Sequence, residues 1–240
     1  MGIAYNTSIV RDGLVLHLDA ANVKSYSGSG TVWKDLSGNG NTGTLANGSV
    51  YNSGDLGYIT LDGVNDYVAT PNSADLISVG NGDFALDAWF QVSGTKTINH
   101  SVVRRDNLLV EGGENRRIIY LFVRANTNVG SFGVYDGSSN SATGTQDLND
   151  GLWHHMVGVY ESSTKTQYLY IDGDLQAQAV YNNSQPFNTA NSPYVIGTTS
   201  PAYVAAQFFG NVSQVKIYNK ALTATEVKQN FEATRGRYGL

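Results

Sequence analysis

The sequence predicts an all-β sandwich of two antiparallel sheets with a short C-terminal helix. Three observations lead to this prediction: short runs alternate between apolar and polar residues, dipeptides of Asn or Asp followed by Gly separate the runs, and one helical pattern stands near the C-terminus. Alternation with a period of two gives each run one apolar face. Many such runs between turns are typical of stacked antiparallel sheets.

The expected turns are spread along the whole chain. Asn, Asp and Gly tolerate the positive φ angles of tight hairpin turns. The dipeptides are Asp12-Gly13, Asn39-Gly40, Asn47-Gly48, Asp62-Gly63, Asn81-Gly82, Asp136-Gly137, Asp150-Gly151 and Asp172-Gly173. The alternating runs between them predict roughly a dozen strands.

The clearest strands have an apolar residue at every second position. The apolar faces consist of Leu14, Leu16 and Leu18; Phe84, Leu86, Ala88, Phe90 and Val92; Val157 and Val159; and Leu169 and Ile171. Because alternate side chains of a strand point to opposite faces, these residues should form the layer between the sheets.

The C-terminal helix has a clear start signal. Thr223 fits the N-cap and Glu226 the third helical position of a capping box, and Leu222 and Val227 fit the hydrophobic staple around it. Val227 and Phe231 then share one helical face. We expect this helix to lie against the sandwich.

Composition limits the classes of function. The 240 residues show no break in composition, so we expect one domain over residues 13–234, with an N-terminal arm (1–12) and a C-terminal tail (235–240). The chain lacks Cys, which excludes thiolate metal sites. A net charge of -5 argues against nucleic acid as a partner. There is neither a membrane-spanning apolar run nor a signal-peptide pattern, so we expect no membrane insertion and no signal-directed export.

The stretch DLSGNGNTG fits two motifs that imply different chemistries. Gly38, Gly40 and Gly43, with Asp62 downstream, have the spacing of a dinucleotide fingerprint. That motif requires a long helix to begin within it, so that the helix amides meet the pyrophosphate. The turn signal at Asn47-Gly48 leaves no room for such a helix, so we reject the nucleotide interpretation.

The same stretch also fits the first half of a calcium loop. The oxygen ligands would come from Asp35, Ser37, Asn39 and Asn41, with Asp19 or Asp62 supplied by other loops. Ala46 stands where an EF-hand needs its bidentate Glu, which excludes an EF-hand. Two possibilities remain: one structural calcium ion, or a cluster of Asx-turns that satisfies its own backbone.

The order of the segments resembles the laminin G-like domains of the concanavalin A-like superfamily. The resemblance rests on GLVLHLDA, WKDLSGNGNTGTL, ITLDGVNDYV, FALDAWFQV, DGLWHHMVGVY, YLYIDGDL and FFGNVSQVKIYNKALTATEV, and covers about residues 13–234. It implies a concanavalin A-like jelly-roll sandwich, in agreement with the alternating patterns.

A narrower resemblance concerns the ends of the chain. IVRDGLVLHLDAANVKSYSGSGTVWKDLSGNGNTGTL and NFEATRGRYGL are similar to segments of virion proteins from tailed bacteriophages. This resemblance implies a protein made in the host cytoplasm and assembled into a virion in several copies, with other capsid or tail proteins as partners.

The pattern of acidic and histidine residues argues against an enzyme. Glycoside hydrolases of the superfamily carry a motif resembling E-x-D-x-E, because hydrolysis needs two carboxylates on one face. The five glutamates do not have that spacing. His154 and His155 lack the spacing of H-E-x-x-H, so we expect them to serve in packing.

Binding is therefore the expected function. Glycans present hydroxyls and apolar ring faces, which suit polar loops and partly exposed aromatic side chains. The candidate residues, all near expected loops, are Tyr26, Tyr51, Tyr135, Asp136, Asn140 and Tyr203. The leading hypothesis is a non-enzymatic virion component that binds host-surface polysaccharide, and the alternative is a stand-alone, calcium-stabilised lectin or carbohydrate-binding module.

Overall fold

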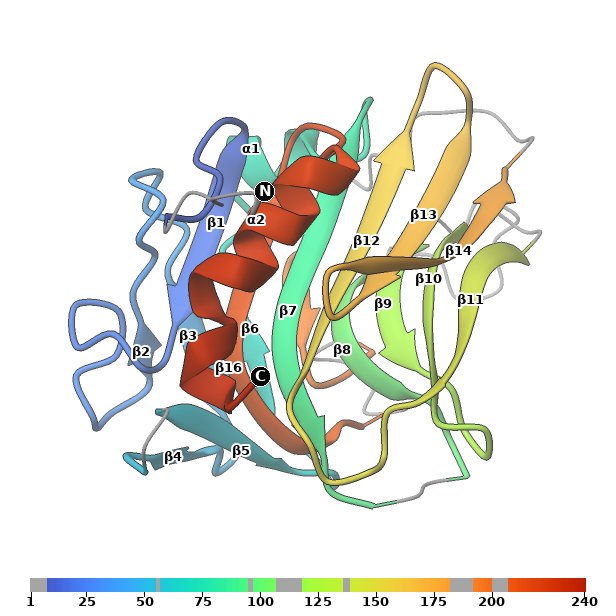
Figure 1. The fold of residues 1–240 in the computed structure, drawn as a ribbon. Helices are drawn as coiled ribbons and strands as arrows, with labels where there is room; N and C mark the ends of the chain where they lie inside the picture. Colours follow the sequence, from blue (N-terminus) through green and yellow to red (C-terminus); the bar gives the residue numbers. More distant parts are fainter. Residues whose placement is uncertain are drawn as a thin grey trace, which may run out of the picture.

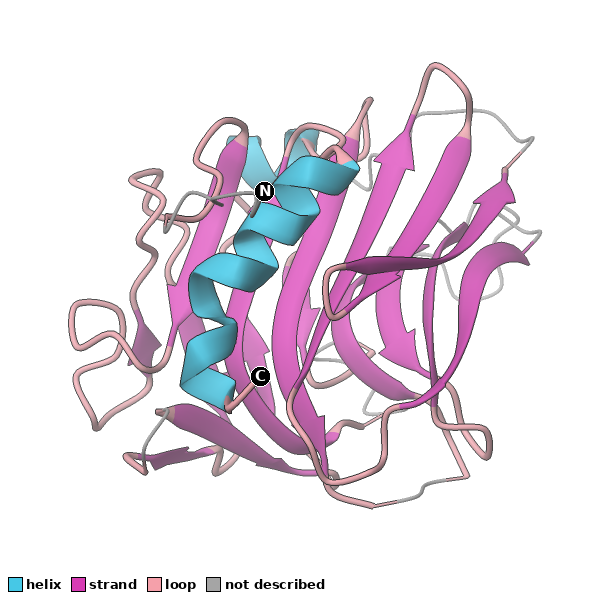
Figure 2. Cartoon of the chain, in the orientation of Figure 1, coloured by secondary structure: helices cyan, strands magenta, loops and turns pink. Residues whose placement is uncertain are grey.

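The computed structural model shows two stacked antiparallel sheets with one helix across the outer face of the first (Figures 1 and 2). The structure describes residues 8–54, 57–94, 97–106, 118–135, 139–181, 192–199 and 207–240. Within these residues each sheet has eight strands. The predicted fold class is therefore confirmed.

Sheet A contains the longest paired strands. In spatial order it consists of β14 (Asp174–Val180), β13 (Thr166–Ile171), β12 (His154–Glu161), β7 (Phe84–Val92), β16 (Phe209–Tyr218), β5 (Tyr58–Asp62) and β4 (Val50–Asn52), and β1 (Leu14–Asp19) also pairs with β16. The strand β16 thus joins segments from both halves of the chain.

Sheet B lies behind sheet A in Figure 1. Its order is β11 (Ser139–Asp147), β10 (Val129–Tyr135), β9 (Ile118–Val123), β8 (His100–Asp106), β15 (Tyr194–Ile196), β6 (Tyr67–Ala69), β3 (Gly43–Ala46) and β2 (Val32–Trp33). The described helical segments are α1 (Ala74–Ser78), α2 (Ala224–Thr234) and the 3-10 turn η1 (Arg235–Tyr238). None of these helices is both long and apolar enough to cross a bilayer.

The core between the sheets follows the predicted alternation in most strands, but Leu14, Val157 and Val159 were wrongly predicted to lie in it: they point to the outer face of sheet A and pack with Leu222 and Val227 beside α2. Leu16 and Leu18 of β1 and Leu169 of β13 are completely buried in the core. The sheets pack closely where Gly158 of sheet A faces Phe132 of sheet B, because a Cβ atom at this glycine would overlap the phenylalanine ring. Any larger residue at position 158 would push the sheets apart.

The predicted start of α2 is confirmed. The Thr223 hydroxyl accepts the Glu226 N–H (3.3 Å), and the Glu226 carboxylate accepts the Thr223 N–H (2.9 Å), so both halves of the capping box are present. Val227 and Phe231 lie buried against sheet A. The short helix α1, which has Ser73 as its N-cap, was not expected from the sequence.

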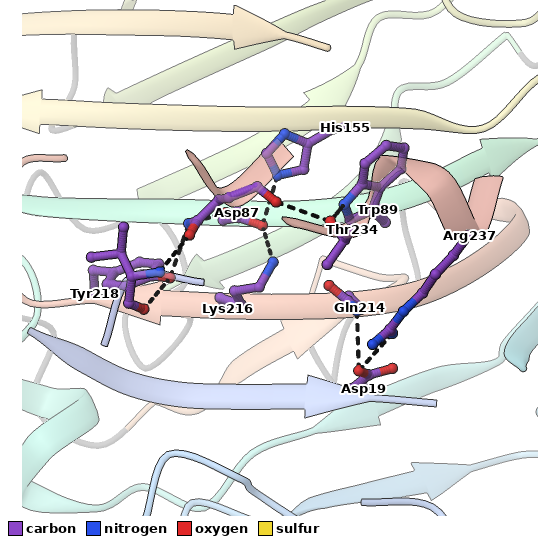
Figure 3. Close-up of polar contacts among 11 residues, drawn as sticks. Asp19, Asp87, Trp89, His155, Gln214, Lys216, Tyr218, Thr234 and Arg237 are labelled. Carbon is purple, nitrogen blue, oxygen red and sulfur yellow. Dashed lines mark hydrogen bonds and ion pairs between the residues drawn. The ribbon is translucent and has the colours of Figure 1, made fainter. Parts of the chain in front are cut away.

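A buried carboxylate holds α2 on sheet A (Figure 3). Asp87 of β7 accepts hydrogen bonds from Lys216 Nζ of β16 (2.9 Å) and Asn230 Nδ2 of α2 (2.9 Å), and it lies 3.1 Å from His155 Nε2 of β12. Burial alone raises the pKa of Asp87, but Lys216 and His155 outweigh it and hold that pKa well below its ordinary value. One ionised side chain therefore links three strands and the helix.

The end of the chain is held by a second set of contacts. The ring of Tyr238 stacks on Trp89 at 3.9 Å, and Phe231 stacks on the same indole at 5.7 Å. Arg237 Nη1 donates to the buried Asp19 carboxylate at 2.8 Å. The predicted tail thus packs on the domain.

Replacing Asp87 with Ala should destabilise the fold strongly. The substitution leaves the buried Lys216 ammonium without its carboxylate, and breaking such a pair costs about 3–5 kcal/mol. Urea denaturation followed by circular dichroism measures the free energy of unfolding. Asp174→Ala is the control: it breaks the exposed pair with Lys228 and should cost under about 1 kcal/mol. Equal losses for the two variants would contradict the anchoring role of Asp87.

The stability of the fold should fall in mild acid because of His17. Burial and the neighbouring Lys216 lower the pKa of His17 from 6.5 to about 4. Between these pH values the unfolded chain binds a proton that the folded chain does not, so stability is lost as the pH falls through this window. His17→Gln should show a shallower loss than the natural chain when unfolding is measured from pH 7 to 4. Identical pH profiles would exclude His17 as a source.

Candidate functional site

The loop after β2 is held against β1 by the side chain of Asp35. Its carboxylate accepts the N–H groups of His17 (2.9 Å), Ser37 (2.8 Å) and Asn41 (2.9 Å) and the hydroxyl of Ser37 (2.7 Å). These donors surround the two carboxylate oxygens. They hold the loop in its shape against β1.

The two amides of this loop also point inward as donors. Asn39 Nδ2 and Asn41 Nδ2 both donate to the carbonyl of Val15, at 3.2 and 2.9 Å. The glycine motif leads at Gly43 into the strand β3. The loop therefore contains the Asx-type hydrogen bonds of one of the two alternatives, and no helix starts within the motif.

The other predicted calcium ligands take different partners. Asp19 accepts from Arg237 and Gln214, and Asp62 accepts the N–H of Val64 at 2.7 Å. Across the described part of the chain, His, Asp and Glu form no group of three that could hold a metal ion. The calcium ion stays a prediction.

The predicted glycan residues do not converge on one described surface. Tyr26 is only 3% exposed, its hydroxyl donates to the carbonyl of Gly30 (2.6 Å), and its ring lies 4.7 Å from that of Tyr51. Tyr135 packs against an apolar cluster on sheet B, while Asn140 Nδ2 donates to the carbonyl of Val180 (2.6 Å). Burial leaves Tyr26 without a free ring face.

Asp136 and Tyr203, the remaining predicted glycan residues, lie outside the described residues. The two consecutive histidines are both buried, and each faces a carboxylate. His154 lies between Asp172 (Nδ1, 2.9 Å) and Asp150 (Nε2, 3.1 Å), whereas His155 faces Asp87. Burial lowers the pKa of His154, but hydrogen bonds to the two carboxylates outweigh it, and the net direction is upward.

A groove of about 300 Å³ lies on the outer face of sheet A, between β12, β13 and the start of α2. The residues that line it are Val159, Glu161, Tyr168, Tyr170, Ala221, Leu222, Thr223 and Ala224. Val159, Tyr170 and Leu222 are buried and form the floor, while Glu161, Tyr168 and Thr223 are more exposed. The groove is concave, with an apolar base and polar edges.

The alternation of β13 creates this groove. Leu169 and Ile171 point into the core, so Tyr168 and Tyr170 must point outward. Tyr168 pairs with Val159 of β12, which places apolar surface beside its ring. The capping box of α2 fixes Thr223 and Ala224, at the start of the helix, as the opposite wall.

A hydrogen-bond pair sets the polar edge of the groove. Glu161 Oε2 accepts the Thr164 hydroxyl at 2.7 Å and the Tyr168 hydroxyl at 3.4 Å. Burial, followed by the proximity of Tyr168, raises the pKa of Tyr170, so its phenol stays protonated. The groove therefore offers one carboxylate and two phenol hydroxyls next to apolar surface.

Sequence reasoning missed Tyr168 and Tyr170, although a signal was present. The run YLYI places two tyrosines on the face opposite the predicted core residues Leu169 and Ile171. Aromatic residues repeated on an outward face are a better indication of a platform than tyrosines in loops. The capping box predicts where α2 begins, but the position of this end of the helix beside β12 and β13 depends on tertiary packing and cannot be predicted from the local sequence.

Solved structures with the same fold include binding domains. The binding domain of Paraclostridial Mosquitocidal Protein 1 matches with a TM-score of 0.70 and 19% identity, over 92% of this chain and 52% of that chain. Domain 4 of AbnA, an extracellular arabinanase from Geobacillus stearothermophilus in complex with arabinotriose, matches with a TM-score of 0.67 and 18% identity, over 90% and 97%. Trypanosoma rangeli sialidase in complex with the inhibitor DANA matches with a TM-score of 0.64 and 18% identity, over 93% and 33%.

A curated relative and a protein family also match. The relative is the rat (Rattus norvegicus) sushi, von Willebrand factor type A, EGF and pentraxin domain-containing protein 1, which is 22% identical over 181 residues. The match covers 73% of this chain but only 4% of the relative. The family described as the concanavalin A-like lectin/glucanases superfamily (Laminin_G_3) matches residues 62–228, more than half of the chain. Together with the two-sheet sandwich, this match shows that the chain belongs to the concanavalin A-like lectin/glucanase superfamily.

Proposed function

We propose that the protein is a non-catalytic carbohydrate-binding domain whose ligand lies in the groove beside α2. The observation that carries this proposal is the pair of outward tyrosines, Tyr168 and Tyr170, next to the carboxylate of Glu161. A volume of about 300 Å³ is at the lower end for small-ligand sites. It suits a short saccharide.

The chemistry of the groove matches that of a sugar ring. A saccharide has an apolar face of C–H groups and a periphery of hydroxyls. Val159, Tyr170 and Leu222 offer an apolar floor, the more exposed Tyr168 offers amphipathic ring surface, and Glu161 offers a strong hydrogen-bond acceptor. The ligand can therefore bury its C–H face while its hydroxyls keep hydrogen-bond partners.

The groove supports binding rather than hydrolysis. Glycoside hydrolysis requires two carboxyl groups, about 5–5.5 Å apart in retaining enzymes. Among the described residues that line the groove, Glu161 is the only one with a carboxylate. The arabinotriose complex of AbnA domain 4 gives an example of a saccharide bound by a domain with this fold.

A virion role is the second candidate, and the resemblance of both end segments to tailed-phage virion proteins favours it. In that setting several copies would attach to other capsid or tail proteins and bind host-surface polysaccharide. Weak binding per copy would suffice, because multivalency raises the effective affinity. Co-sedimentation of the chain with purified particles distinguishes this role from a stand-alone lectin.

Replacing Tyr168 with Ala should weaken saccharide binding about tenfold, which corresponds to about 1.4 kcal/mol of lost ring contact. Isothermal titration with a panel of neutral oligosaccharides that includes arabinotriose measures this effect. Tyr135→Ala, the same change on sheet B, should leave affinity unchanged. Glu161→Gln keeps the shape of the groove and should weaken binding through loss of the charged acceptor. Failure of the natural chain to bind any neutral saccharide, or equal losses in both tyrosine variants, would refute the groove as the site.

The loop of Asp35 should be stable without calcium. Asp35→Ala removes the acceptor of four hydrogen bonds and should destabilise the fold by about 1–3 kcal/mol, because buried N–H groups lose their partner. Thermal unfolding of the natural chain should give the same midpoint in calcium chloride and in EGTA. A rise in the midpoint with calcium that Asp35→Ala abolishes would instead establish the ion as a ligand of this loop.

A further inference from the structure

Arg124 lies on the outer face of sheet B, on the other side of the molecule from the groove. It follows β9 directly, where Leu121 and Val123 point into the core and Phe122 points outward. The guanidinium carbon lies 5.8 Å from the centre of the Phe122 ring, and Nη2 donates to the Ser141 hydroxyl at 3.0 Å. An arginine thus rests on an aromatic ring beside β11.

The charge of Arg124 is not neutralised within the described residues. No carboxylate of that part of the chain lies within ion-pair distance of it, and its Nε atom is buried without a hydrogen-bond partner. By contrast, Arg104 on the same face pairs with Asp106 at 2.7 Å, and Arg237 pairs with Asp19 at 2.8 Å. Because a partly buried cation is unfavourable without a counter-charge, an anion from outside would stabilise this position.

Hydroxyl groups gather next to the guanidinium. The register of β10 and β11 pairs Ser131 with Thr143, whose hydroxyl oxygens are 3.0 Å apart, and Ser141 lies 3.2 Å from Thr143. Tyr120 also faces this group: burial raises the pKa of its phenol, and Ser141 and Arg124 partly offset the rise. Ser141 and Thr143 are only half-buried, so a ligand can reach them.

We propose that Arg124, Ser141 and Thr143 form a second binding site, which takes an oxyanion carried by an acidic saccharide, either a sulfate ester or a carboxylate. The planar guanidinium can donate two parallel hydrogen bonds to such a group. The hydroxyls of Ser141 and Thr143 supply further donors to its oxygens. A cation–π contact with the Phe122 ring helps to position the guanidinium. This site shares no residue with the groove on sheet A and does not depend on the function proposed for it.

Titration calorimetry with three tetrasaccharides tests the site: one sulfated, one made of uronic acids, and one neutral. We expect the sulfated or the uronic ligand to bind, and Arg124→Gln to weaken that binding at least tenfold. Arg124→Lys keeps the positive charge but loses the two parallel N–H donors of the guanidinium, so it should retain only part of the affinity. Arg235→Gln, which removes a half-exposed arginine beside α2, is the matched control and should have no effect.

The outcomes separate the two sites. Loss of acidic-ligand binding in Arg124→Gln but not in Tyr168→Ala supports the second site, whether or not the groove binds neutral sugars. The proposal is overturned if neither acidic ligand binds, if Arg124→Gln binds as tightly as the natural chain, or if Tyr168→Ala abolishes the binding instead. Circular dichroism spectra and unfolding midpoints that match those of the natural chain establish that Arg124→Gln remains folded.

Discussion

The ion pair between Asp87 and Lys216 is the interaction on which the rest of the structure depends. Both side chains are completely buried, so each charge is tolerable only while the other remains in place. Asn230 extends the pair to α2, and the first residue of α2, Ala224, lines the groove. The candidate binding site is therefore built on a buried electrostatic contact of which no atom faces the ligand.

The two outer faces of the sandwich carry different chemistry. On sheet A, α2 crosses in front of β16 and β7 and leaves β12 and β13 uncovered (Figure 1). The groove beside the start of α2 is lined by two tyrosines and, among the described residues, one carboxylate. On sheet B, Arg124 brings positive charge to a face of aromatic and hydroxyl side chains. A chain with a net charge of -5 thus keeps a local attraction for anions.

Features that depend on neighbouring residues could be predicted from the sequence, but contacts between residues far apart in the chain could not. The alternation of Leu16 and Leu18 and the capping box at Thr223 are encoded within a few residues, and both were correctly predicted, whereas an irregularity in the pairing of β1 between Leu14 and Leu16 leaves Leu14 on the outer face. Strands of two or three residues, such as β2 and β15, are too short to show a period. The partners Asp87 and Lys216 are 129 residues apart, and only the pairing of β7 with β16 brings them together. Tyr26 is buried because its loop folds inward, which local composition does not indicate.

The aromatic contacts of Trp89 have a spectroscopic consequence. Its indole lies between Tyr238 at 3.9 Å and Phe231 at 5.7 Å, with the His155 imidazole 5.0 Å away, and its Nε1 donates to Thr234. Three of these four neighbours belong to the last part of the chain. Any detachment of that part would hydrate the indole and shift its fluorescence to longer wavelength, while Trp33, in the core between the sheets, would keep its emission. The protein therefore contains a natural optical reporter for the docking of its C-terminal helix.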